Sequence, residues 1–245
     1  MKTANPALNK NTFAKYMNRE AYGHEAMSID GTINKTFILF LLVIFTAAFS
    51  WLNLGAPYLP VLMIGSLIGG LIFAIITIFK KEWSPFTAPV YALFEGFFLG
   101  ALSGFLNSVY PGIVIQAVGL TFGVLFVMLF LYKTKIIKVT EKFRMGIFAA
   151  TGAVALIYLV SILLGFFGIS VPLIYDNGLV GIIFSLVVVG IAAMNLVLDF
   201  DFIDRGANEK VPKFMEWYAA FGLMVTLIWL YIELLRLLSK LYSRR

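Results

Sequence analysis

The chain has 245 residues, of which 61% are apolar and 13% charged, and its mean hydropathy is +0.93. A soluble domain is about half apolar and about a quarter charged, so one water-soluble core could not bury this much apolar surface. We therefore expect an integral membrane protein. The sequence contains no cysteine, which excludes a disulfide scaffold, a catalytic cysteine and a zinc–thiolate site. The net charge of +6 is assigned to membrane orientation, so no nucleic-acid partner is expected.

Seven apolar segments follow one another with short connections. Each is near the ~20 residues that cross a bilayer as a helix. Because the connections are short, neighbouring helices are expected to pack antiparallel. The predicted spans are Phe37–Leu54, Pro60–Phe79, Phe86–Val109, Ile113–Tyr132, Met145–Phe167, Gly178–Phe200 and Met215–Leu238.

These spans divide the chain into three parts. Residues 1–36 are polar and of mixed charge, contain the one histidine, His24, and have no early apolar run of the kind that a signal peptide needs. We interpret them as a cytoplasmic N-terminal tail. Residues 37–238 form the predicted seven-helix transmembrane domain, and residues 239–245 form a short basic C-terminal tail.

The basic residues indicate the orientation of the chain in the membrane. The N-terminal tail and the loops after the second, fourth and sixth spans carry all the lysines and arginines that precede the seventh span. Basic residues favour the cytoplasmic side, so the N-terminus is predicted to be cytoplasmic. Seven spans then place the C-terminus on the opposite side, against its own basic residues. The last helix either crosses against the charge rule or is re-entrant or interfacial; its length favours crossing. The four basic residues at the C-terminal end of the chain are Arg236, Lys240, Arg244 and Arg245.

Charged side chains inside membrane spans are costly, and they are therefore the first candidates for function. Asp199 and Asp201 lie at the cytoplasmic end of the sixth span. Asn195 and Asp199 are four residues apart and share a helix face, whereas Asp199 and Asp201 point to nearly opposite sides. We expect Asp199 to face the bundle with Asn195 in support, and Asp201 to reach the headgroups or a loop.

The seventh span carries an acid and a base on one face. Thr226, Trp229, Glu233 and Arg236 follow one another at spacings of three and four. Two interpretations stay open for Glu233: a local pair with Arg236 that reaches water at the membrane edge, and a functional carboxylate.

Glu95 lies near the middle of the third span, beside a stripe of glycines. Gly96, Gly100 and Gly104 recur every four residues, a spacing that lets another helix approach closely. Glu95 is therefore a candidate either for an ion path or for a hydrogen bond across a helix interface.

Buried carboxylates suggest a particular chemistry. A low dielectric disfavours their charged form, and two close carboxylates share a proton and titrate as a pair. Their oxygens are also hard ligands that suit Ca²⁺. If Asp199 and Glu233 meet, they form a proton- or cation-coupled device and a candidate calcium site.

Several other chemistries lack the residues that they need. No lysine lies between Lys213 and Lys240 to bind retinal, and Ser103 has no basic partner in sequence for proteolysis. Nucleotide-binding and EF-hand patterns are also missing. We therefore expect neither an enzyme nor a cofactor.

Several motifs together resemble a known family. They are the acid–glycine pair of the third span (Glu95 and Gly96), the acid in V-L-D-F-D (Asp199), the acid in L-Y-I-E-L-L (Glu233), and M-S-I-D-G-T-I-N-K-T leading into the first span. From about Met27 onward the chain resembles the Bax inhibitor family, also called the transmembrane Bax inhibitor motif family, and within it the bacterial branch.

The resemblance implies an all-α membrane protein, a seven-helix bundle in which the other six helices surround the last. It also implies a pH-dependent leak of Ca²⁺ down its gradient, with Asp199 and Glu233 as the pH-sensing acids. Two departures stand out. Glu233 replaces the usual aspartate, and the second span has no lysine or arginine to latch the acid pair. Arg236 is the candidate replacement for that latch.

Our first functional hypothesis is a pH-sensitive leak for Ca²⁺ or another cation in a bacterial inner membrane. The alternative is a membrane protein that regulates a protease or a cell-death partner without ion transport. A secondary transporter is disfavoured because the sequence shows no inverted repeat. The oligomeric state is left open.

Overall fold

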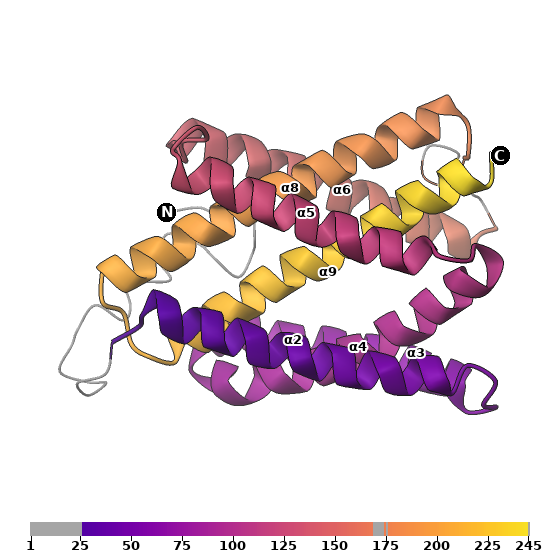
Figure 1. The fold of residues 1–245 in the computed structure, drawn as a ribbon, viewed down its shortest axis with the longest axis horizontal. Helices are drawn as coiled ribbons and strands as arrows, with labels where there is room; N and C mark the ends of the chain where they lie inside the picture. Colours follow the sequence, from indigo (N-terminus) through magenta and orange to yellow (C-terminus); the bar gives the residue numbers. More distant parts are fainter. Residues whose placement is uncertain (1–25, 169–173, 175, 245) are drawn as a thin grey trace. The chain divides into compact units, whose positions relative to one another are not determined.

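The computed structural model describes residues 26–168, 174 and 176–244 (Figure 1). Within these residues the chain forms seven α-helices and one short 3₁₀ helix. In chain order they are α2 (Ile29–Leu52), α3 (Leu59–Phe79), η2 (Lys81–Trp83), α4 (Ser84–Val109), α5 (Ile113–Lys133), α6 (Glu141–Phe166), α8 (Leu179–Asn208) and α9 (Met215–Tyr242).

The predicted fold class is confirmed. All seven α-helices are long and apolar enough to cross a membrane. The described residues contain no β-strand beyond one isolated bridge between Ala26 and Pro212. The chain is an all-α membrane protein, as the hydropathy pattern predicts.

The helix ends differ from the predicted spans because polar residues extend the helices beyond the apolar stretches. Helix α2 begins at Ile29 and so reaches into the segment that we assigned to the tail. Its start is fixed by Ser28, whose side chain accepts a hydrogen bond from the Gly31 backbone N–H, and by Asp30 in the first turn. Helix α8 continues past Phe200 to Asn208, and α9 past Leu238 to Tyr242. Hydropathy marks the hydrocarbon region, not the end of helical hydrogen bonding.

Helix α9 is the most buried of the seven. In its most apolar stretch 67% of the residues are buried, against at most 44% in any other span. A helix exposed to lipid on one side would bury far less. The central position of the last helix among the other six stays a prediction.

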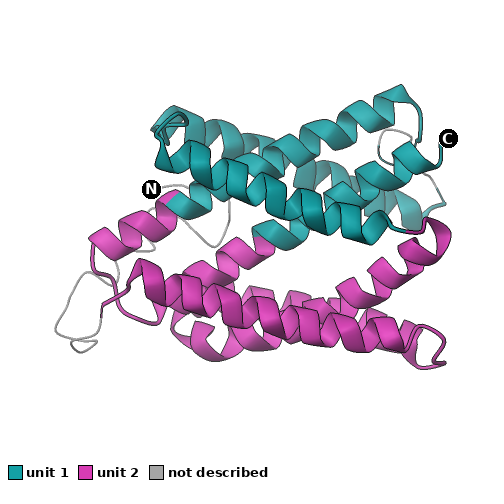
Figure 2. Ribbon diagram, viewed as in Figure 1, with its two compact units in different colours: residues 1–9, 112–200, 226–245 teal, residues 10–111, 201–225 magenta. Residues whose placement is uncertain are grey.

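The chain divides into two compact units, and α8 and α9 each contribute to both (Figure 2). Of the described residues, unit 1 comprises 112–168, 174, 176–200 and 226–244, and so includes α5, α6, most of α8 and the second half of α9. Unit 2 comprises 26–111 and 201–225, and includes α2, α3, η2, α4, the end of α8 and the start of α9.

Unit 2 is organised around α4, which packs against both α2 and α3. The predicted glycine stripe makes the first contact possible. A Cβ atom at Gly96 would overlap Thr46 and Val43 of α2, and one at Gly100 would overlap the backbone of Ala47. The stripe is therefore a helix interface, where the absence of side chains lets two backbones approach.

The start of α9 is fastened to the start of α2 within unit 2. The Glu216 carboxylate is 1% exposed and accepts hydrogen bonds from the Ser28 backbone N–H and the Ser28 hydroxyl, both at 2.9 Å. The ammonium of Lys35 completes the set. A Cβ at Gly31 would overlap this carboxylate, so the glycine leaves room for it. These contacts give the M-S-I-D-G-T-I-N-K-T segment a structural role.

Candidate functional site

Glu233 of α9 is the centre of a polar network in the interior of unit 1. Its side chain is 1% exposed. The Tyr158 hydroxyl of α6 donates a hydrogen bond to Glu233 Oε1 at 2.8 Å. Arg236 Nη1 lies 3.2 Å from Oε1 and 3.3 Å from Oε2. The carboxylate thus has a neutral donor from another helix and a cationic donor from its own.

Arg236 is held in two ways. Besides its ion pair with Glu233, its guanidinium lies over the ring of Tyr158, with Cζ 4.7 Å from the ring centre. Such a cation–π contact adds to the ion pair. The Tyr158 ring also packs edge-on against Phe184 of α8 at 6.4 Å. The local Glu–Arg pair that the sequence allowed is present, but it is part of a contact among three helices.

Asp199 lies on the inner face of α8. It is 1% exposed, and its neighbour on the same face, Asn195, is 3% exposed. The Asn195 amide donates to Thr151 Oγ1 of α6 and to the Ile191 carbonyl, both at 2.9 Å. The structure therefore places Asn195 and Asp199 on one buried face, as their spacing predicts.

Asp199 and Glu233 are both buried within unit 1, and the hydrogen-bond partners of the Glu233 carboxylate are Tyr158 and Arg236. Their action as a coupled pair stays a prediction.

Asp201 differs from Asp199 in its surroundings. It belongs to unit 2, is partly exposed, and forms an ion pair with Arg205 one turn along α8, at 2.9 Å. The opposite orientation of two residues two apart on a helix accounts for the contrast. Asp201 therefore lies away from the buried face that holds Asp199.

Glu95 lies at a helix interface of unit 2. Its carboxylate is hydrogen-bonded to Tyr91, one turn earlier on α4. A Cβ at Gly70 of α3 would lie 3.0 Å from Glu95 Oε1, so the acid rests against the α3 backbone. Of the two roles left open by the sequence, this geometry favours the helix-interface one.

Two functional candidates lay outside our sequence prediction. Tyr158 carries no signal in the sequence, because only the fold brings α6 to Glu233. Lys240 does carry a signal in the sequence, because it lies four residues after Arg236 and so continues the helix face of Glu233 and Arg236. Lys240 belongs to the predicted basic tail, yet its side chain is buried.

The described residues offer no preformed site for a tightly bound metal. No group of three or more His, Cys, Asp or Glu side chains able to hold a metal ion occurs among them. Ca²⁺ takes six to eight oxygen ligands.

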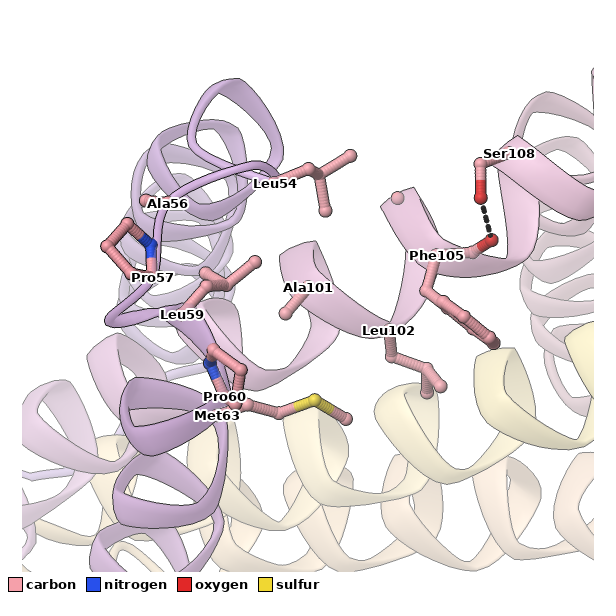
Figure 3. Close-up of a pocket in the computed structure, with 11 residues that line it drawn as sticks. Leu54, Ala56, Pro57, Leu59, Pro60, Met63, Ala101, Leu102, Phe105 and Ser108 are labelled. Atoms are coloured by element: carbon pink, nitrogen blue, oxygen red, sulfur yellow. Dashed lines mark hydrogen bonds between the residues drawn. The ribbon is translucent and has the colours of Figure 1, made fainter.

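A separate pocket of about 410 Å³ lies in unit 2, between the α2–α3 connection and the end of α4 (Figure 3). It contains none of the acids discussed above. Its lining is apolar except for Ser108, whose hydroxyl donates to the Phe105 carbonyl at 2.7 Å. The lining residues include Leu54, Pro57, Pro60, Met63, Leu102 and Phe105.

Comparison with known protein families shows which family the chain belongs to. A family model described as Bax inhibitor 1 like matches residues 5–243. The chain belongs to the Bax inhibitor 1 like family. No curated protein matches it closely enough to count as a relative. For this Bax inhibitor 1 like protein, the resemblance seen in the motifs is confirmed over nearly the whole chain; the bacterial origin and the cytoplasmic N-terminus stay predictions.

Proposed function

We propose that the protein is a pH-sensitive leak for cations, with Ca²⁺ as the first candidate ion, and that carboxylates on α8 and α9 gate it. Family membership and the seven membrane-spanning helices support a membrane function. The observation that carries the proposal is the buried Glu233 carboxylate with its two different donors.

The proposed gate is the Glu233–Arg236–Tyr158 network. An ion pair loses its Coulomb attraction when one partner loses its charge, and solvent already screens this pair because the Arg236 side chain is partly exposed. Protonation of Glu233 would remove the attraction that holds Arg236. The Arg236 side chain is 32% exposed, so it already has a way out of the interior. Acidification would thus release the latch and shift a closed-to-open equilibrium.

Asp199 is the second acid of the proposal. It is as buried as Glu233 and lies in the same unit. Once Glu233 is protonated and Arg236 is released, the Asp199 carboxylate would be the charged oxygen ligand for a cation that enters the unit. Carboxylate oxygens are the ligands that Ca²⁺ prefers. Ca²⁺ is the transported ion in this scheme, with no resident metal.

Flux through purified protein tests the activity itself. We expect liposomes that contain the protein and a Ca²⁺ dye to take up Ca²⁺ faster than empty liposomes, and faster at acidic than at neutral pH. Asp199→Asn should change this pH dependence, whereas Glu82→Gln, at an exposed position of η2, should not. Uptake equal to that of empty liposomes at every pH would contradict the proposal. If a membrane protein then also co-purified, the result would favour the interaction role.

A further inference from the structure

Lys240 of α9 buries its charge in the interior of unit 1. The side chain is 3% exposed. Its ammonium donates to the Gly181 carbonyl and to the Ser185 hydroxyl of α8, both at 2.9 Å. Within the described part of the chain it forms no ion pair with a carboxylate. A lysine near a membrane edge ordinarily extends to water, so this inward orientation needs a reason.

The oxygen atoms around the ammonium form a built site at the start of α8. A Cβ at Gly181 would overlap the Asp176 carbonyl and lie 3.4 Å from Lys240 Nζ. Glycine at this position therefore lets the Asp176 backbone and the ammonium both approach. The Asp176 carboxylate accepts a hydrogen bond from the Gly178 backbone N–H at 3.0 Å, and its charge also attracts the ammonium. The ammonium thus lies against one carbonyl and one hydroxyl oxygen of α8, with the Asp176 backbone close to Gly181.

These oxygens suit a bare monovalent cation. Carbonyl oxygens replace the hydration shell of ions in channels, and an ammonium group accepts the same surroundings. Two neutral hydrogen bonds offset only part of the several kcal/mol that burial of a charge costs; at longer range the charges of Glu233 and Asp176 favour the ammonium and that of Arg236 opposes it. A neutral side chain could link α8 and α9 without the free-energy cost of burying a charge.

The position of Lys240 relates this site to the acids. Glu233, Arg236 and Lys240 share one face of α9, and Lys240 is two turns beyond Glu233, roughly 10 Å along the helix axis. A cation that moved along this face from Glu233 toward the C-terminal end of α9 would meet the ammonium.

We propose that Lys240 is a tethered cation that fills an oxygen-lined cation site on α8 and so blocks passage along this face of α9. The inference rests on the proposed leak for its transport consequence. The site itself, Gly181 O and Ser185 Oγ, is a separate claim. It would accept a small monovalent cation, such as an alkylammonium, once the lysine is removed.

The test is removal of the ammonium and its replacement in solution. Lys240→Ala should raise cation flux about tenfold, the factor for a barrier lowered by roughly 1.4 kcal/mol. The n-propylammonium ion has the atoms that this substitution removes, and millimolar amounts should restore the block. The matched control is Arg244→Ala, one turn further at an exposed position, which should change neither flux nor its response to propylammonium.

A binding measurement separates this inference from the leak. Propylammonium should raise the Tm of Lys240→Ala protein in detergent and leave that of the wild type unchanged. If no variant conducts but this Tm shift appears, the leak fails and the cation site stands. Absence of both the Tm shift and the flux increase overturns the site. If Lys240→Ala does not fold, Lys240→Met replaces it in the flux measurement, because methionine keeps the apolar stem of the lysine. Cation flux through Lys240→Met equal to that of the wild type would then contradict the proposal that Lys240 blocks passage.

Discussion

At the scale of single residues, Glu233 is the best-supported candidate because its carboxylate is buried and yet held by a charge. Arg236 supplies the charge and Tyr158 a directed hydrogen bond. The pattern of the sequence predicted the acid and its in-helix base. It could not predict Tyr158, because nothing local to α6 indicates that this phenol meets α9.

Tyr158→Phe tests the role of that phenol. The substitution removes the hydroxyl but keeps the ring that contacts Arg236 and Phe184. A donor stabilises the charged carboxylate, and a hydrogen bond to a charged group contributes about 1.5–3 kcal/mol. Without this donor the charged carboxylate is less stabilised, so we expect the flux–pH curve of Tyr158→Phe to lie at higher pH than that of the wild type.

Tyr242→Phe is the control for this change. It removes a phenol of unit 1 that accepts a hydrogen bond from Gln116, at the far end of α9. Its flux–pH curve should match that of the wild type. A Tyr158→Phe curve that also matches it would show that the phenol plays no part in the gate.

At the scale of helices, the sequence predicted which segments form them but not where all of them end. Hydropathy locates the apolar stretch, whereas the start of α2 depends on Ser28 and on its contacts with Glu216 of α9. The glycine stripe of α4 was correctly predicted as an interface, because small residues at four-residue spacing have few other uses in a membrane. The partner helix, α2, could not be read from the stripe.

Gly100→Ala tests this interface. The added methyl would overlap the backbone of Ala47, and overpacking of this kind costs about 1–3 kcal/mol. We expect a lower Tm in detergent. Gly65→Ala is the matched control, since no atom lies within 4 Å of a Cβ placed there and alanine has the higher helix propensity. A Tm for Gly100→Ala equal to or above that of Gly65→Ala would contradict close packing of α2 on α4.

At the scale of the whole molecule, the basic C-terminal end no longer argues strongly against seven crossings. Arg236 and Lys240 bind oxygen atoms of unit 1. The positive-inside rule concerns basic residues in loops, so these two should not be counted. The sequence could not separate them from Arg244, since burial of a lysine depends on what another helix offers it.

The orientation can be measured because the chain has no cysteine of its own. We expect Ser243→Cys, which follows α9, to react with a membrane-impermeant maleimide added from outside to cells whose outer layers have been removed and whose inner membrane is intact. Thr134→Cys, in the α5–α6 connection, should react only after the membrane is opened. Both positions are exposed in the structure. Labelling of both cysteines from the same side would mean that α9 does not cross.

The pH dependence of Ca²⁺ flux in Glu233→Gln protein tests the central claim most directly. Glutamine imitates the protonated acid and cannot pair with Arg236 as a charge. We predict liposome flux that is high at neutral pH and nearly independent of pH, while the wild type rises only on acidification. A Glu233→Gln protein that conducts and keeps the wild-type pH profile would contradict the assignment of Glu233 as the gate.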